Sequence, residues 1–246
     1  MKISVVTAVY NRRKTIAEAI ESVQAQTYAN IEHVIQDGAS SDGTLDIIRS
    51  TLDSGTTLES APDHGIYDAI NRGITRASGD VIGLMHSDDV FANPDVIHKI
   101  ADVFEDPDVD GVYGDLHYVS DATPSRVIRH WHSGASSPNR LNRGWMPPHP
   151  TLYLRRGVFD KWGLYDTSYQ IAADYDAMLR YLIQGQIKLA YIPEVLVKMR
   201  VGGESNKSIA KILQKSREDY RAVRSNRVGG LPTLAMKNLS KIKQFF

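Results

Sequence analysis

Residues 79–89 read Gly-Asp-Val-Ile-Gly-Leu-Met-His-Ser-Asp-Asp, an apolar run that ends in two adjacent carboxylates. The segment from Val81 to Met85 is short and apolar and follows Ser-Gly-Asp, so it predicts a buried, parallel strand and not a helix. Asp88 and Asp89 therefore fall at the carboxyl end of that strand. Ligands bind at this edge of open α/β sheets, and paired acidic side chains there suit a hard divalent cation that carries a phosphate-containing ligand.

The residues that follow predict a helix start. Asn93 suits the cap position and Pro94 the first helical position, which leaves Asp88 and Asp89 in the turn before the helix. An isolated Asp-Asp pair is more often an ordinary polar turn. The strand in front of this pair, and the other loops described below, favour a binding site.

Strands and helices alternate along the first half of the chain. β-branched and apolar runs alternate with segments whose apolar residues recur every three to four positions. The predicted strands are 3–10, 31–37, 57–59 and 81–85, and the predicted helices are 15–26, 44–52, 66–74 and 95–104. This order is typical of right-handed βαβ units. It predicts an α/β fold with a doubly wound, mainly parallel sheet and helices on both faces.

Polar side chains follow each predicted strand of this half. Asn11, Asp37, Asp63 and the Asp88-Asp89 pair all come after a strand. Because the carboxyl ends of parallel strands meet at one edge of a sheet, we expect these four loops to converge on one rim.

The composition limits the possible function classes. The 246 residues are 42% hydrophobic and carry 29 basic and 29 acidic side chains, so charge gives no argument for nucleic acid, and no such partner is expected. Cysteine is absent, which excludes disulfides, thiolate metal sites and cysteine nucleophiles. The sequence contains neither a cleavable apolar leader nor a segment long enough to span a bilayer, so a cytoplasmic location is expected.

The second half of the chain is less regular. Strands are predicted over 109–115, 116–119, 126–131 and 187–192, with extended chain over 195–199 and a helix over 172–182. Residues 133–150 are rich in Gly, Ser, Pro, Asn and Arg and show no periodicity, which predicts a long functional loop.

The carboxyl-terminal segment, 205–246, is basic and amphipathic. Ten Lys and Arg residues between Lys207 and Lys243 are accompanied by two acidic residues, Glu218 and Asp219, and by an apolar stripe. Such helices bind membrane surfaces, or they pack on their own domain. Both interpretations stand for 209–223, whereas 231–246 is interpreted as a peripheral membrane contact at the inner face of the cell membrane.

The predicted rim has no glycine-rich phosphate loop. Neither G-x-G-x-x-G nor G-x-x-x-x-G-K-[ST] occurs, which disfavours classical dinucleotide and P-loop binding. A site that holds a diphosphate without such a loop needs a metal ion, and Asp88 and Asp89 can supply ligands. Asp37 is placed to accept a hydrogen bond from a base N–H, although an Asp before Gly38 also suits an ordinary turn.

Five short motifs in a fixed order resemble those of family-two glycosyltransferases with the GT-A fold. Bacterial enzymes of exopolysaccharide and colanic-acid-type repeat-unit assembly look most similar. The resemblance covers roughly residues 1 to 200. Its motifs are Thr-Ala-Val-Tyr-Asn at 7–11, Gln-Asp-Gly-Ala-Ser-Ser-Asp-Gly-Thr at 36–44, Asp-His-Gly-Ile-Tyr-Asp-Ala-Ile-Asn-Arg-Gly at 63–73, Ser-Asp-Asp at 87–89 and Ala-Asp-Tyr-Asp at 173–176.

The resemblance implies a nucleotide-sugar donor, most often a UDP-sugar, and Mn²⁺ or Mg²⁺ as cofactor. Asp174 matches the position of the catalytic base, and Asp89 that of the main metal ligand. The positions implied in donor binding are Thr7, Val9 and Asp37 at the base, Tyr10, Asn11 and Arg12 in the nucleotide loop, Asp63, Asp68 and Asn71 along the donor site, and Asp88 at the ribose.

The implied reaction is a single in-line displacement with inversion. A positioned carboxylate at Asp174 can accept the proton of the attacking acceptor hydroxyl, which contributes about 10²–10⁴-fold to a rate. A helix N-cap is the alternative role of Asp174. Two departures weaken the match: His86 stands where the family often has Asp, and Ala173 stands where an acidic residue commonly precedes the base. No Gln-x-x-Arg-Trp follows, which argues against a processive synthase.

The acceptor side is assigned to Trp145, His149 and the stretch 129–132, Arg-His-Trp-His, because aromatic faces suit sugar rings, although a buried Trp is more common. The basic tail and the family together suggest a saccharide or a polyprenyl-diphosphate-linked acceptor. Residues 202–205, Gly-Gly-Glu-Ser, are expected to close near the diphosphate. The expected division is a glycosyltransferase domain over 1–204, with a nucleotide-sugar half at 1–115 and an acceptor half at 116–204, followed by the basic extension at 205–246.

Two other functions remain open from the sequence. A sugar nucleotidyltransferase would share the nucleotide-binding rim and the metal, but its usual glycine-rich loop is absent after the first strand, where Asn-Arg-Arg-Lys occupies 11–14. A non-catalytic nucleotide-sugar-binding module is the second alternative, and His86 and Ala173 keep it open.

Overall fold

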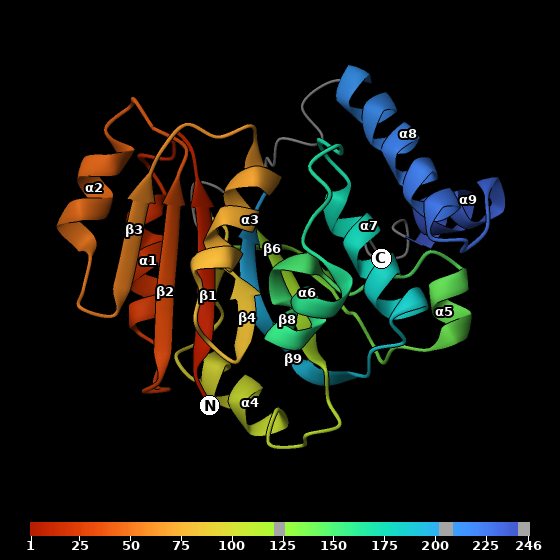
Figure 1. The fold of residues 1–246 in the computed structure, drawn as a ribbon, viewed down its shortest axis with the longest axis horizontal. Helices are drawn as coiled ribbons and strands as arrows, with labels where there is room; N and C mark the ends of the chain where they lie inside the picture. Colours follow the sequence, from red (N-terminus) through yellow and green to blue (C-terminus); the bar gives the residue numbers. More distant parts are fainter. Residues whose placement is uncertain (121–125, 202–208, 241–246) are drawn as a thin grey trace.

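The computed structural model, which describes residues 1–120, 126–201 and 209–240, is built on one nine-stranded sheet (Figure 1). The strand order is β3-β2-β1-β4-β8-β6-β9-β5, and β7 pairs with β6 beside this path. The strands are β1 Ile3–Val9, β2 Ile31–Asp37, β3 Thr56–Ser60, β4 Val81–Leu84, β5 Val90–Phe91, β6 Gly111–Val119, β7 Val127–Trp131, β8 Tyr153–Arg155 and β9 Leu189–Arg200.

The first four predicted strands form the parallel half of the sheet. β1 pairs in parallel with β2 and with β4, and β2 pairs in parallel with β3. Val9 lies opposite Asp37, and Asp37 lies opposite Ser60, so three strands end at the same edge. The predicted doubly wound, mainly parallel sheet is confirmed. β8 pairs antiparallel with β4 and β6, and β5 pairs antiparallel with β9.

Helices cover both faces of this sheet. One apolar cluster joins α3, α6, α7 and α8 to the sheet, and a second joins α1 and α4 to its other face. Figure 1 shows α2 at one end of the molecule and α8 with α9 at the other. The α-helices are α1 Ile16–Gln24, α2 Thr44–Thr51, α3 Ile66–Arg76, α4 Val96–Val103, α5 Pro138–Asn142, α6 Arg156–Trp162, α7 Ala173–Leu179, α8 Ile209–Ser225 and α9 Leu231–Ser240.

Several predicted boundaries were wrong. α4 begins at Val96, because Asn93 Oδ1 accepts a hydrogen bond from Asp95 N and forms a turn ahead of the helix. Residues 109–119 contribute one strand and not two. The segment 133–150 holds α5 and the start of a 3-10 turn, His149–Thr151. β8 and α6 were not predicted.

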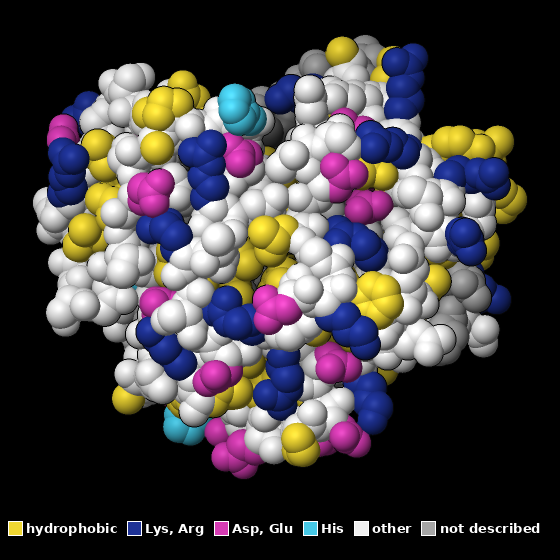
Figure 2. Space-filling model, viewed as in Figure 1, with side chains coloured by type: hydrophobic (Ala, Val, Ile, Leu, Met, Phe, Trp, Pro, Cys, Tyr) yellow, Lys and Arg dark blue, Asp and Glu magenta, His cyan; other side chains and the backbone are white. Residues whose placement is uncertain are grey.

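The basic helices α8 and α9 pack on the domain through one face. Ala222 and Val223 of α8 belong to the main apolar cluster, and Thr233 and Lys237 of α9 are buried. In the same view, basic and apolar side chains gather over α8 and α9 at the upper right (Figure 2). Within the described ranges, no helix combines the length and apolar character needed to cross a bilayer. The expectations for 202–205 and for 241–246 lie outside the described residues.

Candidate active site

Hydrogen bonds between loops join the carboxyl ends of β1, β2 and β3. Asp37 is fully buried, and its carboxylate accepts hydrogen bonds from Ser40 N at 3.1 Å, Ser40 Oγ at 2.5 Å and Ser60 Oγ at 2.6 Å. Asn11 Oδ1 accepts a hydrogen bond from Ser41 N at 3.0 Å. Asp37 thus organises the rim in the manner of a turn-forming Asp, and its contact with a nucleotide base stays a prediction.

The loops after β1, β2 and β3 meet at Gly38. A Cβ atom on Gly38 would lie 2.4 Å from Asp63 Oδ2 and 3.4 Å from Tyr10 Cδ2, so any larger residue would displace the Asp63 side chain. Tyr10 is 58% exposed, and Arg12 Nη1 donates to Asn11 O at 3.2 Å. The structure therefore brings Tyr10, Asn11, Arg12 and Asp63 together at the open rim.

Two predicted donor contacts do not reach this rim with their side chains. Thr7 and Val9 lie inside β1 and are buried. Thr7 Oγ1 is 2.9 Å from His33 Nε2, which is itself buried in β2. The side chains of Thr7 and Val9 contribute to the core in this arrangement, and their role at the nucleotide stays a prediction.

Two other predicted donor contacts, Asp68 and Asn71 on α3, hold neighbouring loops. Asp68 Oδ2 accepts a hydrogen bond from His64 N at 3.0 Å and pairs with Arg72 at 2.8 Å. Asn71 bonds the backbone of Tyr165 twice, through Nδ2 to Tyr165 O at 2.8 Å and through Oδ1 from Tyr165 N at 3.0 Å. Both side chains already have partners in the protein, and their contacts with a donor remain predictions.

The tip of β4 carries a buried carboxylate with one unused oxygen. Asp89 Oδ1 accepts a hydrogen bond from Arg200 N at 3.2 Å, and Asp89 Oδ2 has no hydrogen-bond partner among the described residues. Burial, together with the neighbouring charge of Asp88, raises the pKa of Asp89 well above its usual range. A divalent cation would offset both effects, so the tip fits a metal ion with Asp88 and Asp89 as ligands.

Asp88 and Asp174 both lie near His86, and Asp174 also lies near His149. The rings of His86 and His149 are 5.7 Å apart, and His149 Nε2 lies 2.9 Å from Tyr165 OH. Burial lowers the pKa of His86, against the opposing charges of Asp88 and Asp174. Burial also lowers the pKa of His149 to about 4, with Asp174 opposing and His86 adding to the shift. The cluster thus places Asp88 and Asp174 beside two buried imidazoles whose pKa values are both lowered by burial.

Asp174 is not a helix cap. α7 begins at Ala173, and Ala172 occupies the cap position. Tyr67 OH instead lies 3.2 Å from Asp174 Oδ1 and 2.7 Å from Ile171 O, and these two acceptors share its one proton. The cap alternative for Asp174 is therefore wrong, and the carboxylate is turned from its own helix towards α3.

Glu218 on α8 fixes the segment that precedes Asp174. Its carboxylate accepts backbone hydrogen bonds from Gln170 N at 3.2 Å, Ile171 N at 2.8 Å and Ala172 N at 3.0 Å. The basic extension therefore contributes directly to the position of α7, although the sequence presented Glu218 as one of two acids in a basic helix.

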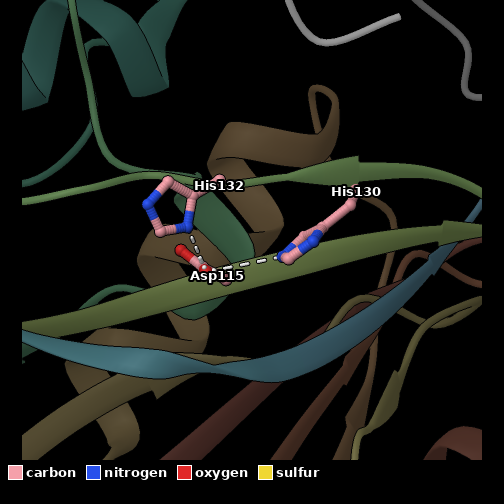
Figure 3. A group of neighbouring side chains, drawn as sticks. All are labelled: Asp115, His130 and His132. Carbon is pink, nitrogen blue, oxygen red and sulfur yellow. Dashed lines mark hydrogen bonds and ion pairs between the residues drawn. The ribbon is translucent and has the colours of Figure 1, made fainter. Parts of the chain in front are cut away.

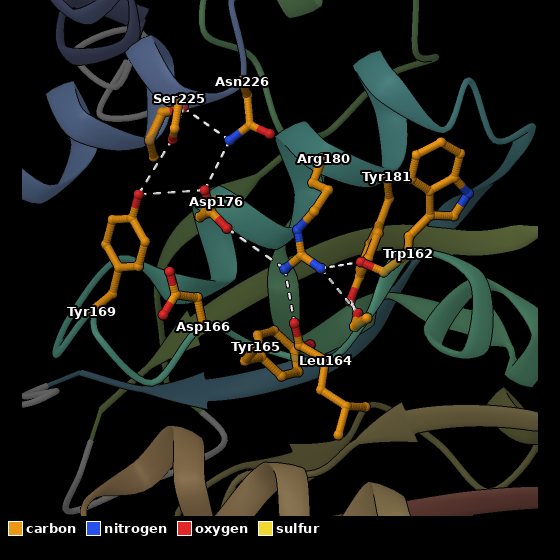
Figure 4. A network of polar contacts seen from close by, with 12 residues as sticks. Trp162, Leu164, Tyr165, Asp166, Tyr169, Asp176, Arg180, Tyr181, Ser225 and Asn226 are labelled. Atoms are coloured by element: carbon orange, nitrogen blue, oxygen red, sulfur yellow. Dashed lines mark hydrogen bonds and ion pairs between the residues drawn. The ribbon is translucent and has the colours of Figure 1, made fainter.

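Arg180 holds the loop that carries Tyr165 (Figure 4). Its guanidinium donates to Trp162 O, to Gly163 O at 3.1 Å and to Leu164 O at 2.8 Å. Tyr165 then stacks on Tyr67 with ring centroids 5.9 Å apart. A continuous set of contacts thus runs from this loop through Tyr67 to Asp174.

The two predicted acceptor residues, Trp145 and His149, lie in different surroundings. Trp145 packs on the core, with Nε1 donating to Ser133 O at 3.0 Å and its ring edge-on to Tyr113 at 5.6 Å. His149 instead lies in the cluster around Asp174, with its ring 5.7 Å from that of His86. Contact of either residue with an acceptor stays a prediction.

Sequence reasoning missed Tyr67, Tyr165 and Glu218. Tyr67 lies inside the motif at 63–73, where its place between two predicted donor residues was the available signal. Tyr165 and Glu218 carried no local signal, because their partners lie 94 and 46 to 48 positions away along the chain.

Two proteins of known structure share the fold of this chain. The mannosyltransferase PcManGT from Pyrobaculum calidifontis, solved with GDP-Man and Mn²⁺, matches with a TM-score of 0.68 and 17% identity over 97% of this chain and 68% of its own. TarS of S. aureus, residues 1–349 with UDP-GlcNAc, matches with a TM-score of 0.69 and 18% identity over 93% and 66%. The chain spans 39% of the longer TarS structure. The fold is therefore that of the GT-A glycosyltransferases.

The sequence relationship is more specific. The model of glycosyl transferase family 2 matches residues 4–172. A PGL/p-HBAD biosynthesis glycosyltransferase of Mycobacterium bovis is 29% identical over 213 residues, 85% of this chain and 80% of its own. An uncharacterised glycosyltransferase of Nostoc sp. is 30% identical over 223 residues, 84% of this chain and 66% of its own. The chain belongs to glycosyl transferase family 2, and it is a glycosyltransferase.

Proposed function

We propose that this enzyme is an inverting, non-processive glycosyltransferase that moves a hexosyl or N-acetylhexosaminyl group from a UDP-sugar to an acceptor hydroxyl. Its acceptor is a saccharide or a polyprenyl-diphosphate-linked saccharide in bacterial surface polysaccharide synthesis. Residues 1–115 hold the donor, residues 116–204 hold the acceptor, and residues 205–246 form the basic extension. The solved relatives support the donor class, because they carry UDP-GlcNAc or GDP-Man.

One observation supports the proposal most directly. Asp88 and Asp174 are 86 positions apart in the sequence, yet both lie close enough to His86 to affect its pKa. A transferase must hold the diphosphate of the donor next to the base that activates the acceptor. The tip of β4 and the start of α7 meet this requirement. The family match ends at residue 172, so the role of Asp174 depends on this proximity.

In the proposed reaction the acceptor oxygen attacks the anomeric carbon as the bond to the diphosphate oxygen breaks. Asp174 takes the proton of the acceptor hydroxyl, and the nucleoside diphosphate departs with the bonding electrons. The hydrogen bond from Tyr67 OH fixes the orientation of Asp174. Because a single displacement occurs, the anomeric configuration inverts.

A divalent cation, Mn²⁺ or Mg²⁺, would be held by Asp88 and Asp89 and would supply positive charge opposite the departing diphosphate. The unused Asp89 Oδ2 supports this assignment. Because Asp89 Oδ1 already accepts the hydrogen bond from Arg200 N, Oδ2 is the oxygen of Asp89 that would bind the ion.

Family membership favours glycosyl transfer over the two alternatives, nucleotidyl transfer and binding alone. A panel of nucleotide-sugars in a thermal-shift assay, with and without Mn²⁺, identifies the donor, because a ligand that binds the native state raises its apparent stability. Nuclear magnetic resonance of the product then gives the anomeric configuration. Stabilisation by a UDP-sugar only when Mn²⁺ is present, followed by an inverted product, is expected. A product that retains the donor configuration would remove Asp174 as a base in a single displacement.

We further propose that the outer face of α8 and α9 contacts an anionic membrane surface. The two acidic side chains of α8 face inward, since Glu218 bonds the backbone before α7 and Asp219 pairs with Lys237 at 2.7 Å. Exposed apolar side chains, Ile212, Leu213, Leu231 and Met236, remain outside with exposed arginines (Figure 2). This combination is typical of peripheral membrane helices.

A further inference from the structure

A second group of metal-ligating side chains lies on the β6–β7 hairpin, outside the cluster around Asp174 (Figure 3). β6 and β7 pair antiparallel with His117 opposite His130. Because side chains alternate along a strand, Asp115 and His117 of β6 share one face with His130 and with His132, which directly follows β7. The pairing thus gathers one carboxylate and three imidazoles from segments that are 13 or more positions apart.

His130 and His132 both lie close to the same oxygen of Asp115. His132 Nδ1 lies 2.9 Å and His130 Nε2 3.4 Å from Asp115 Oδ2. All three ligand atoms lie within 4.8 Å of one another. Ligand atoms of a tetrahedral zinc site, with bonds of about 2.0–2.1 Å, lie about 3.3 Å apart. Small side-chain movements therefore suffice to place one ion between them.

The other oxygen of Asp115 is fixed by the protein. Asp115 Oδ1 accepts hydrogen bonds from Ser133 N at 2.8 Å and from Tyr191 OH at 2.7 Å. Burial opposes the ionisation of Asp115, but these two hydrogen bonds and that of His132 outweigh it and lower the pKa of Asp115. The two hydrogen bonds to Oδ1 thus orient the carboxylate, which is what outer-shell partners do for a metal ligand.

The histidines leave room for water on the metal. The side chains of His130 and His132 are 48% and 69% exposed, whereas that of Asp115 is 4% exposed. A buried carboxylate with two exposed imidazoles supplies three protein ligands and an open side, the arrangement in which solvent completes the coordination.

This group is separate from the proposed nucleotide site. In the pairing of β6 with β9, Val119 lies opposite Arg200, whose backbone N–H bonds Asp89. Asp115 lies four residues earlier on β6, roughly 13 Å away at about 3.3 Å per residue. An ion bound between Asp115 and the histidines would not contact Asp88 or Asp89.

We propose that Asp115, His130 and His132 form a binding site for a divalent metal of the Zn²⁺ class, which ties the end of β7 to β6 at the start of the segment 133–150. Two imidazoles select Zn²⁺ over Mg²⁺ and Mn²⁺, which prefer oxygen ligands and bind nitrogen sites more weakly. This metal site does not depend on the proposed function.

An ordinary surface ion pair is the competing explanation, and the chain offers a matched example. His98 Nε2 lies 3.6 Å from Asp102 one turn along α4, with both side chains exposed. That pair has one imidazole, and within the described residues its carboxylate lacks hydrogen bonds like those that hold Asp115. His98→Gln is therefore the control for the loss of a histidine that pairs with an acid and binds no metal.

The test uses untagged protein titrated with Co²⁺ in excess Mg²⁺, with Zn²⁺ as competitor. We expect one equivalent of Co²⁺ to give the visible absorption of a histidine-bound ion and Zn²⁺ to abolish it. His130→Gln and His132→Gln should each lose the band, and His98→Gln and Asp88→Asn should keep it. Tyr191→Phe should weaken binding roughly 10-fold, because it frees the carboxylate from an outer-shell partner.

Thermal unfolding gives a second readout that does not depend on colour or on activity. Zn²⁺ should raise the midpoint of the wild type and of His98→Gln, and it should leave that of His132→Gln unchanged. Both histidines are exposed, so their variants fold even if Asp115→Asn does not. The proposal is overturned if the wild type shows no saturable Co²⁺ band, if His132→Gln keeps the band, or if Asp88→Asn removes it.

Discussion

Asp174 and Asp176 stand two positions apart on α7 and contact different parts of the molecule. Asp174 faces Tyr67 and the paired histidines, whereas Asp176 is buried and accepts a hydrogen bond from Asn226 Nδ2 at 2.8 Å. One carboxylate is available for chemistry and the other is held by the protein. Their substitution therefore separates catalysis from stability.

Asp174→Asn should retain donor affinity and lose transfer by about 10²–10⁴-fold, because the amide cannot take the acceptor proton. Its unfolding midpoint should change little. Asp176→Asn should lower the free energy of unfolding by about 1–3 kcal/mol, since a buried hydrogen bond and the ion pair with Arg180 are weakened, while turnover per folded molecule is kept. UDP release and urea denaturation measure the two effects. Near-normal turnover of Asp174→Asn would exclude it as the base.

His33 makes stability depend on pH. Burial lowers the pKa of His33 from 6.5 to about 4, against the charge of Asp53. Between pH 6.5 and 4 the unfolded chain therefore binds a proton at His33 and the folded chain does not. The free energy of unfolding falls as the pH is lowered through this window. The loss amounts to roughly 3 kcal/mol at about 1.4 kcal/mol per pKa unit.

His33→Gln should flatten the decline of the unfolding free energy between pH 6.5 and 4, as measured by urea denaturation at several pH values. His98→Gln, which replaces an exposed histidine, should leave the slope unchanged. An equal slope in the wild type and His33→Gln would show that His33 is not the group responsible. The remaining slope is assigned to His149 and His86, whose pKa values are also lowered by burial.

The strands of the parallel half were predicted from the sequence pattern, whereas β8 and α6 were not. β1, β2 and β4 are largely apolar runs separated by amphipathic helices, so local sequence specified them. β8 has three residues and α6 has seven, too few for a periodic signal. Their existence depends on pairing with β4 and β6, a tertiary effect that no local window contains.

The pairing of β4 with β8 requires a glycine. A Cβ on Gly83 would lie 2.1 Å from the ring of the buried Tyr153. Gly83→Ala should therefore destabilise the fold by about 1–3 kcal/mol. Gly157 in α6 has no atom within 4 Å of its Cβ position, so Gly157→Ala should stabilise by about 0.4–1 kcal/mol. Urea denaturation compares the two variants, and a shift of the same sign in both would refute this account of the β4–β8 contact.

The candidate active site was predictable from the sequence only in part. Parallel pairing sends the carboxyl ends of β1, β2, β3 and β4 to one rim, which sufficed to collect Asn11, Asp63 and Asp88. The approach of α7 to this rim depends on Tyr67, on Arg180 and on Glu218 of the extension. These contacts link distant segments and involve residue types that also serve ordinary surfaces, so the sequence alone could not identify them.

The extension therefore has one face that packs on the domain and one exposed face, and different substitutions can test each of them. Deleting 231–246 would remove the buried Lys237, which pairs with Asp219 and lies 3.2 Å from the ring centre of Tyr175, and would disturb the fold as well as any membrane contact. Substitutions confined to the outer face avoid this problem. Leu213 and Leu231 are suitable because they are 56% and 67% exposed.

Leu213→Glu with Leu231→Glu should weaken binding to vesicles that contain anionic lipid, because it removes apolar contact and adds like charge. Co-sedimentation with such vesicles measures the effect, and binding of the wild type should also fall as salt is raised. Ile128→Glu, at a similarly exposed apolar residue on β7, is the matched control and should bind as the wild type does. Donor affinity should be equal in all three proteins. If the wild type ignores anionic vesicles, or if Ile128→Glu weakens binding as much as the double variant, the outer face of α8 and α9 is not the membrane contact.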